Sequence, residues 1–195
     1  LKDITNDPDT PTLLRYDKAK YEDYVTNCLG IKSTAAQHER AEKLLLQLPM
    51  LSLPFEYSYD FIMDMSGTAT PDKALMPLLK TYVDAETDLS NCHVAQLPAV
   101  DGYRLLLVCG NNAVGEGRFF LCSIDKQGKL TENLLIYTAQ TILWKGKEEN
   151  SFLHFKVNKG GQITLNKTIV HNGKEVVISK KNIQFRRGIF YSISD

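Results

Sequence analysis

Hydrophobic residues follow two different spacings along this chain, helical toward the N-terminus and alternating toward the C-terminus. Apolar residues at helical spacing predict one helix over residues 12–29, which Gly30 stops, and a second that begins at Thr34 and ends at Pro49. Thr34 and Gln37 stand in the register of a capping box. Both helices are amphipathic, so we expect each to pack through its apolar face.

The spacing changes to strict alternation at Pro54. An aromatic or apolar residue occupies every second position from 55 to 63, which predicts one half-buried strand near residues 54–63. A third helix is predicted to open with Thr70 as its cap and Pro71 in its first turn. Residues 84–98 have no clear period, and we interpret them as a connection into a sheet.

Short strand-forming runs separated by turns follow Gly102. The predicted strands cover residues 103–109, 118–125, 129–138, 151–157, 162–170, 176–179 and 189–193, with two less regular runs at 141–145 and 182–186. The turns at Gln127-Gly128, Gly160-Gly161 and Asn172-Gly173 each offer a glycine for a positive φ. Connections this short keep neighbouring strands adjacent, so the pattern predicts an antiparallel meander.

A weak internal repeat supports the meander. Residues 119–136 lie over residues 152–169 at an offset of 33, with six of eighteen positions identical. Each copy has the pattern of a strand, a tight Lys-x-Gly turn and a strand. The second copy alternates between a buried and a wet face, whereas the first is apolar on both faces, so residues 118–125 are expected to be central or covered by helices.

The predicted fold class is α+β, with N-terminal amphipathic helices packed on a C-terminal antiparallel β-meander of about seven to nine strands. We expect one domain with four parts. These are a polar leader remnant at 1–12, a mostly helical part at 13–100, an aromatic strand near 54–63 inside it, and the meander at 101–195. The polar start at Leu1 suggests a removed leader and therefore export. No apolar stretch approaches the ~20 residues that span a bilayer, so no transmembrane segment is predicted.

Charge is balanced overall but divided between the two halves of the chain. Residues 1–100 carry 9 Lys and Arg against 15 Asp and Glu, and residues 101–195 carry 14 against 8. This division fits two layers of complementary charge or a basic sheet face that attracts anions. One cluster near the C-terminus combines cations with an aromatic residue: Lys180, Lys181, Phe185, Arg186 and Arg187. Nucleic-acid binding requires a basic stripe with several stacking platforms, so no nucleic-acid partner is predicted.

The cysteines and histidines form no predicted site. Cys28, Cys92, Cys109 and Cys122 have no metal-ligand spacing, and we expect free, buried thiols. Cys92 and His93 are adjacent, but neighbours in a strand point in opposite directions, which disfavours a nucleophile and its base. His38, His154 and His171 are scattered over different predicted elements.

Two loop motifs are better explained as scaffold. Residues 110–117 are rich in glycine but lack the Gly-Lys-Ser/Thr ending of a phosphate-binding loop and lead into a strand, which predicts a hairpin loop. Asp84, Glu86 and Asp88 alternate as in a calcium loop, but Leu89 and Ala95 stand where the turn glycine and the closing glutamate belong. The sequence therefore predicts no catalytic, cofactor-binding or metal-binding residue, and no cofactor.

The strand entry Leu53-Pro54-Phe55, the Thr-Pro-Asp helix start at Thr70, the run Tyr-Arg-Leu-Leu-Leu-Val from Tyr103, and Asp-Lys-Gln-Gly-Lys from Asp125 appear in that order. This arrangement over residues 50–195 resembles uncharacterised secreted lipoproteins of Bacteroidetes-type bacteria. The resemblance implies export to the cell envelope, periplasmic or at the surface, and a lipid anchor upstream of Leu1. It implies no catalytic residues, and the lipobox cysteine of such an anchor is absent from this sequence.

The leading functional hypothesis is a non-enzymatic exported domain that binds a protein or a glycan on the open face or the hairpin rim of its sheet. One alternative is a hydrolase whose carboxylates, such as Asp60, Asp64 or Asp84, converge only in the fold. Another is an inhibitor or immunity-type partner protein that uses its acidic N-terminal half as the contact surface.

Overall fold

The computed structural model describes residues 34–193, and their side chains from residue 39 onward. The chain divides into two compact units with a boundary between Lys43 and Leu44. Helix α3 (Thr34–Leu46) spans this boundary and confirms the second predicted helix. The helix predicted over residues 12–29 lies outside the described residues, and the single-domain organisation stays a prediction.

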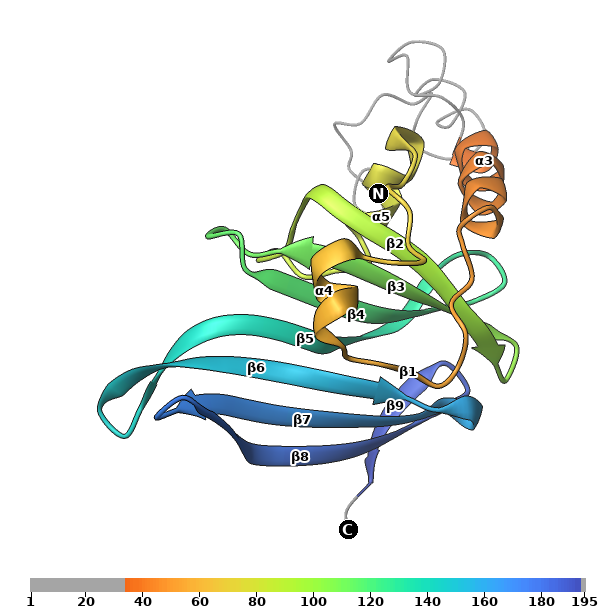
Figure 1. Ribbon diagram of the computed structural model, residues 1–195. Helices are drawn as coiled ribbons and strands as arrows, with labels where there is room; N and C mark the ends of the chain where they lie inside the picture. Colours follow the sequence, from red (N-terminus) through yellow and green to blue (C-terminus); the bar gives the residue numbers. More distant parts are fainter. Residues whose placement is uncertain (1–33, 194–195) are drawn as a thin grey trace, which may run out of the picture. The chain divides into compact units, whose positions relative to one another are not determined.

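One antiparallel sheet dominates the second unit (Figure 1). Its strands are β1 (Phe55–Glu56), β2 (Asp88–Val100), β3 (Tyr103–Asn111), β4 (Gly117–Ile124), β5 (Leu130–Trp144), β6 (Lys147–Val157), β7 (Gln162–His171), β8 (Lys174–Arg186) and β9 (Ile189–Ile193). Strands β2 to β9 follow one another in the sheet in chain order, which confirms the predicted meander and the α+β class. Short helices stand between or beside the strands: α4 (Tyr59–Asp64), η1 (Lys73–Leu75), α5 (Met76–Leu79) and η2 (Lys159–Gly161).

Strand β5 is shared between two parts of the sheet. Its first half pairs with β4 as far as Thr138, and its second half, from Thr138 onward, pairs with β6. The C-terminal end of β6 is therefore left without β5 beside it. Strand β1 pairs there instead, with Phe55 opposite Val157 and Glu56 opposite Lys156. This pairing satisfies backbone groups that the divergence of β5 would otherwise leave open.

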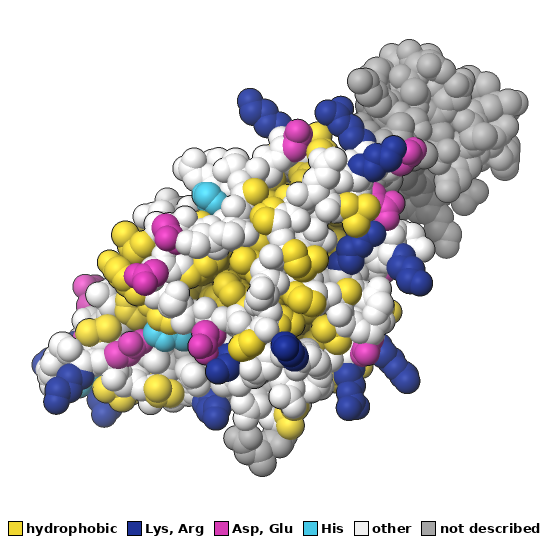
Figure 2. Space-filling view, turned by 45° about the vertical axis from the view of Figure 1, so that its right-hand side comes forward, with side chains coloured by type: hydrophobic (Ala, Val, Ile, Leu, Met, Phe, Trp, Pro, Cys, Tyr) yellow, Lys and Arg dark blue, Asp and Glu magenta, His cyan; other side chains and the backbone are white. Residues whose placement is uncertain are grey.

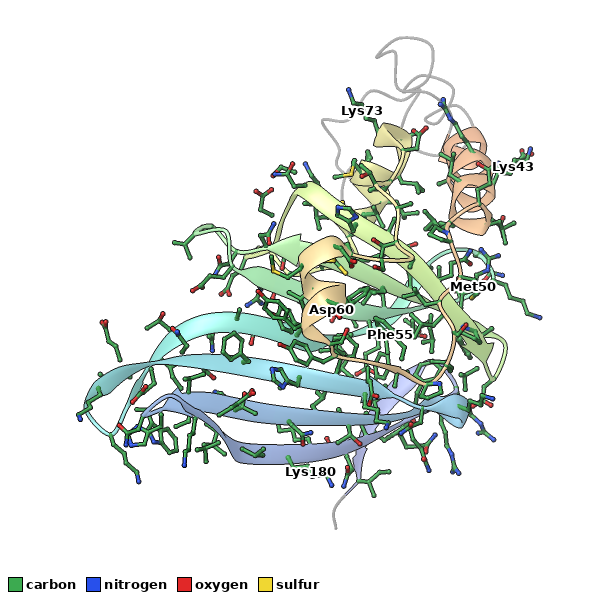
Figure 3. The ribbon with its side chains drawn as sticks, in the orientation of Figure 1. Lys43, Met50, Phe55, Asp60, Lys73 and Lys180 are labelled. Atoms are coloured by element: carbon green, nitrogen blue, oxygen red, sulfur yellow. The ribbon has the colours of Figure 1, made fainter. Side chains whose placement is uncertain are left out.

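The main core collects residues from strands β2 to β8, and on β3 and β4 it uses one face of the sheet. Its buried members are Phe61, Leu97, Leu105, Leu107, Cys109, Phe119, Leu121, Ile136, Tyr137, Phe155, Val157, Ile163, Leu165, Ile183 and Phe185. Helix α4 contributes Phe61 to this core. Phe55 lies between α4 and β6, edge-on to Phe61 with ring centroids 4.9 Å apart and 5.1 Å from Phe155 (Figure 3). The segment before the helix thus packs α4 onto the sheet.

The other face of β3 and β4 is buried as well. All residues from Phe119 to Ile124 are buried, which confirms the prediction that this strand is apolar on both faces. Tyr82 lies on the face that carries Cys122, because the Cys122 thiol and the Asn133 amide both donate to the Tyr82 carbonyl. The Tyr82 hydroxyl in turn donates to the Gly128 carbonyl. Tyr82 therefore pins the segment after α5 to the β4–β5 hairpin.

The predicted strand near residues 54–63 is wrong beyond Glu56. Residues 59–64 form α4 because the Ser58 side chain caps its start, accepting a hydrogen bond from the Phe61 N–H at 3.1 Å. Met65 closes the helix in the left-handed region, at φ 51°, and its N–H donates to the Phe61 carbonyl. Alternation over so few residues does not distinguish a strand from a short helix when a cap is present.

The connection predicted over residues 84–98 is also wrong, because residues 88–100 form β2. This strand has no regular alternation since several consecutive residues are buried on both faces. Its outer edge is partly covered by bridges to Ala69 and Met50. The third helix begins later than predicted, at η1 with Asp72 as its cap, and the runs at 176–179 and 182–186 join into the single strand β8.

Candidate functional site

A hollow of about 1080 Å³ lies where the β8–β9 hairpin meets the β2–β3 turn. We call it the rim hollow. Its lining residues are Asp101, Gln184, Arg186, Arg187, Tyr191 and Ile193. Two adjacent guanidinium groups, one phenol ring, one amide and one carboxylate are therefore gathered at one place on the surface.

The register of β8 and β9 explains why these side chains share one face. Gln184 lies opposite Tyr191 and Arg186 lies opposite Ile189, and directly opposed residues of an antiparallel pair point the same way. Phe185 and Phe190, between them, point to the opposite face and pack against the core. The outward face thus has two parallel rows, a polar and cationic row on β8 and an apolar row on β9.

The apolar row is unusually exposed for residues of its type. Ile189 is 42% exposed, Tyr191 is 50% and Ile193 is 48%. Successive apolar side chains on one side of a strand normally face a core. The described residues leave this row uncovered.

The tip of the hairpin is held in place by two other parts of the sheet. The Arg187 N–H donates to the Asp101 carboxylate at 3.2 Å, and the Thr131 hydroxyl donates to the Gly188 carbonyl at 2.8 Å. The Glu132 carboxylate accepts the Phe190 N–H. Since these bonds link the tip both to the β2–β3 turn and to the start of β5, the rim hollow is preorganised.

The turn itself explains why glycine stands at position 188. Arg187 and Gly188 have φ angles of 49° and 84°, the pair of positive values that a two-residue type I′ hairpin requires. A Cβ at position 188 would lie 2.7 Å from the Tyr103 ring. Only glycine fits both the backbone angle and this close approach.

The charges of the rim hollow are largely uncompensated within the described residues. Arg186 and Arg187 are both exposed, and neither makes an ion pair with a described side chain. Asp101 is the acidic residue of the lining, and its carboxylate is bound to a backbone N–H. Two guanidinium groups without a bound carboxylate are suited to hold an external anion.

The basic cluster predicted near the C-terminus is divided by the fold. Arg186 and Arg187 line the rim hollow, whereas Phe185 is fully buried in the core and offers no ring for stacking. Lys180 and Lys181 are exposed farther along β8, where Figure 3 labels Lys180. Tyr191 is the aromatic residue that joins the arginines instead.

A second cluster surrounds His154. Its imidazole stacks on the Tyr57 ring with centroids 3.8 Å apart and planes 7° from parallel, and Tyr57 also stacks on Tyr137. Nε2 of His154 lies 3.4 Å from a Glu175 oxygen without hydrogen-bonding geometry. Burial lowers the pKa of His154, which Glu175 partly opposes.

Figure 2 shows one face of the molecule on which hydrophobic side chains gather centrally, with most Lys and Arg around them.

This second cluster does not assemble a catalytic relay. Ser151 is buried and without a hydrogen-bond partner in the described residues, but it stands three positions from His154 on β6, so the two side chains leave opposite faces of the strand. Glu175 accepts a hydrogen bond from the Thr168 hydroxyl at 2.6 Å. Nearby, His171 pairs with Glu149 at 2.7 Å. These contacts join β6, β7 and β8 to one another.

The three carboxylates of the hydrolase hypothesis are either bound to a nearby residue or exposed to solvent. Asp64 on α4 accepts hydrogen bonds from the Ser66 N–H and hydroxyl. Asp84 pairs with Arg118, which also lies 3.7 Å from Glu86. Asp60 is exposed on α4, where Figure 3 labels it. No contact links Asp84 to the two α4 carboxylates in the part of the chain that the structure describes.

Cys92 and His93 lie on β2 and face different surroundings. The Cys92 thiol is buried near the Met76 sulfur, and burial raises its pKa, whereas Nδ1 of His93 lies 3.1 Å from the Thr68 hydroxyl. Cys92, Cys109 and Cys122 are free and buried, as predicted, while Cys28 lies outside the described residues. Residues 112–116 form the β3–β4 hairpin loop, as predicted.

Within residues 39–193, no three His, Cys, Asp or Glu side chains are gathered closely enough to hold a metal ion. Of the helices in the described part of the chain, none has the length and apolarity to cross a membrane. Comparison with known proteins gives no match to this chain among protein-family models, curated proteins or solved structures.

Proposed function

We propose that this protein is a non-enzymatic binding domain that takes up an anionic ligand at the rim hollow. The observation that carries the proposal is the pairing of two exposed guanidinium groups, Arg186 and Arg187, beside the half-exposed ring of Tyr191 on a hairpin tip. Guanidinium groups bind carboxylates and sulfates through paired hydrogen bonds. Such groups at a rim also speed the association of an anion.

The rigidity of the hairpin tip supports binding over a purely structural role. Three hydrogen bonds, from Arg187 to Asp101, from Thr131 to Gly188 and from Phe190 to Glu132, fix the backbone between the arginines and the tyrosine. A fixed backbone reduces the entropy that a ligand has to remove on binding. These hydrogen bonds hold in place a hairpin tip on which Arg186, Arg187 and Tyr191 are exposed to solvent.

The test is a titration of the full chain with three anionic polymers, polygalacturonate, heparin and polyglutamate, at low ionic strength. Arg186→Gln combined with Arg187→Gln is expected to weaken binding at least about tenfold, because it removes two charge-assisted contacts. The matched control combines Lys145→Gln with Lys147→Gln. Lys145 stands in the same kind of turn, at φ 46°, on the β5–β6 hairpin.

Binding of none of these polymers, or an equal loss in both double variants, would refute the proposal. Turnover of a substrate in a hydrolase panel that is lost on a single substitution would refute its non-enzymatic part. Export to the cell envelope remains part of the proposal, supported by the resemblance of residues 50–195 to secreted lipoproteins. Fractionation of expressing cells tests it.

A further inference from the structure

We infer that the ligand of the rim hollow is an acidic glycan chain, one that carries uronate or sulfate groups along a run of sugar rings. This inference rests on the proposed function and names its ligand class. It follows from three observations: the two rows on the outward face of β8 and β9, the size of the hollow, and the Phe190 N–H on the free edge of β9, which already donates a hydrogen bond to Glu132.

The two rows match the two surfaces of an acidic sugar ring. A pyranose has an apolar C–H face and a rim of hydroxyl groups, and its uronate or sulfate group projects from that rim. Tyr191, half exposed on β9, offers a ring for the C–H face. Gln184 lies directly opposite it, and because its amide nitrogen donates to the Gly160 and Phe185 carbonyls, its side-chain oxygen is the group left to accept from a sugar hydroxyl. Arg186 and Arg187 follow at the turn, within the same hollow, to take the acidic group.

The hollow suits a chain rather than a small anion. The hollow is open to solvent, and its volume of about 1080 Å³ is at the upper limit of the ~300–1,000 Å³ usual for small-molecule pockets. None of the six lining side chains is buried, so the hollow has no buried donors to enclose a single sulfate or phosphate. A polymer that passes across the face gains from repeated contacts instead.

A peptide strand is disfavoured by the backbone of β9. The Phe190 N–H points away from β8 and is already taken by the Glu132 carboxylate. Because outward-facing groups alternate along a strand, Ser192 is the next residue with free outward groups within the described part of β9. An added peptide strand would therefore lose the hydrogen bond that the Phe190 N–H would otherwise donate to it. Nucleic acid is disfavoured because Tyr191 is the single aromatic residue in the lining.

The experiment compares polygalacturonate, heparin, neutral dextran, polyglutamate and a single-stranded DNA oligonucleotide by calorimetric titration of the full chain. The decisive variant is Tyr191→Leu, which keeps an apolar, strand-compatible side chain at this position and removes the ring. We expect polygalacturonate, heparin or both to bind, with affinity roughly tenfold lower in Tyr191→Leu and unchanged in Tyr59→Leu, an exposed tyrosine on α4. A preference for heparin over polygalacturonate would show that sulfate groups contribute to binding, because heparin carries both uronate and sulfate groups.

The outcomes separate the two proposals. Binding of polyglutamate or DNA as tight as that of the glycans, dependent on the arginines but not on Tyr191, would overturn the glycan assignment and leave the anion-binding function standing. Equal binding of dextran would overturn the requirement for an acidic ligand in both proposals, since a neutral chain needs no arginine. Absence of binding by every anionic probe would overturn both. Thermal melting of each variant verifies that it is folded.

Discussion

The backbone N–H of Arg187 donates a hydrogen bond to the carboxylate of Asp101, at 3.2 Å, across 86 positions of the chain. Asp101 stands in the β2–β3 turn at φ 53°, so it combines a strained turn position with an anchor for the β8–β9 tip. Its carboxylate also places a negative charge in the rim hollow. The hydrogen bond to Arg187 favours binding of an anionic ligand because it fixes the hairpin tip. The negative charge of Asp101 disfavours binding because it repels the anion.

Asp101→Asn separates these two effects. Asparagine keeps a side-chain oxygen for the Arg187 N–H and tolerates the left-handed backbone, but it removes the charge. We predict that the affinity for polygalacturonate rises roughly two- to fivefold, as the loss of one repulsion at a solvent-exposed site suggests. Calorimetric titration measures it, and a weaker affinity in a variant of unchanged melting temperature would contradict it.

Phe55 and Glu56 are neighbours on β1 with opposite environments. Phe55 packs against Phe61 and Phe155, whereas Glu56 is exposed and pairs with Lys156 at 3.1 Å. We predict that Phe55→Ala lowers the free energy of unfolding by about 3 kcal/mol and that Glu56→Ala changes it by less than about 1 kcal/mol. Urea denaturation measures both, and equal effects would show that β1 is placed wrongly.

Tyr82 ties the segment after α5 to the β4–β5 hairpin through its hydroxyl. Tyr82→Phe removes the hydrogen bond to the Gly128 carbonyl and leaves that buried acceptor unpaired. The expected loss of unfolding free energy is about 1–2 kcal/mol. Tyr59→Phe is the control, because Tyr59 is 68% exposed and should be neutral. Urea denaturation measures both variants, and an unchanged free energy of unfolding in Tyr82→Phe would contradict the prediction.

The His154 stack predicts a dependence of stability on pH. Burial lowers the pKa of His154 in the folded state below its ordinary value of 6.5, so the folded protein binds this proton less readily than the unfolded chain does. The contribution is therefore fully present above pH ~6.5 and is lost as the pH falls below it. Melting temperatures from pH 8 to pH 5 should fall less steeply for His154→Phe, which can stack on Tyr57 but does not titrate. Equal slopes would contradict the prediction, since the His171–Glu149 pair is common to both proteins.

The hairpins could be predicted from sequence because their determinants are local. Alternation and turn glycines predict β3, β4, β7 and β9 close to their observed bounds. They divide β5 and β8 into two runs each, and they start β6 four residues later than the structure does. Strand β2 could not be predicted in this way because its apolar residues do not alternate. It is buried on both faces, and that burial depends on residues distant in sequence. The alternation after Glu56 predicts a strand, but the structure has helix α4 there because the Ser58 side chain caps its start.

The rim hollow could be predicted only in part. The sequence predicts a basic cluster that contains Arg186 and Arg187, with Phe185 as its aromatic residue. Phe185 is instead buried, because adjacency in sequence does not reveal which face of a strand a side chain takes. Pairing the predicted runs 182–186 and 189–193 across the Arg187-Gly188 turn would have placed Tyr191 opposite Gln184. Asp101 enters through a contact between hairpins far apart in the chain, for which the sequence carries no local signal.

Mapping of amide chemical shifts during titration with polygalacturonate tests the central claim most directly. We predict that the largest changes fall on the β2–β3 turn around Asp101 and on residues 184–193, which form the two sides of the rim hollow. Largest changes around Tyr57 and His154, or no changes at concentrations that saturate binding, would contradict it.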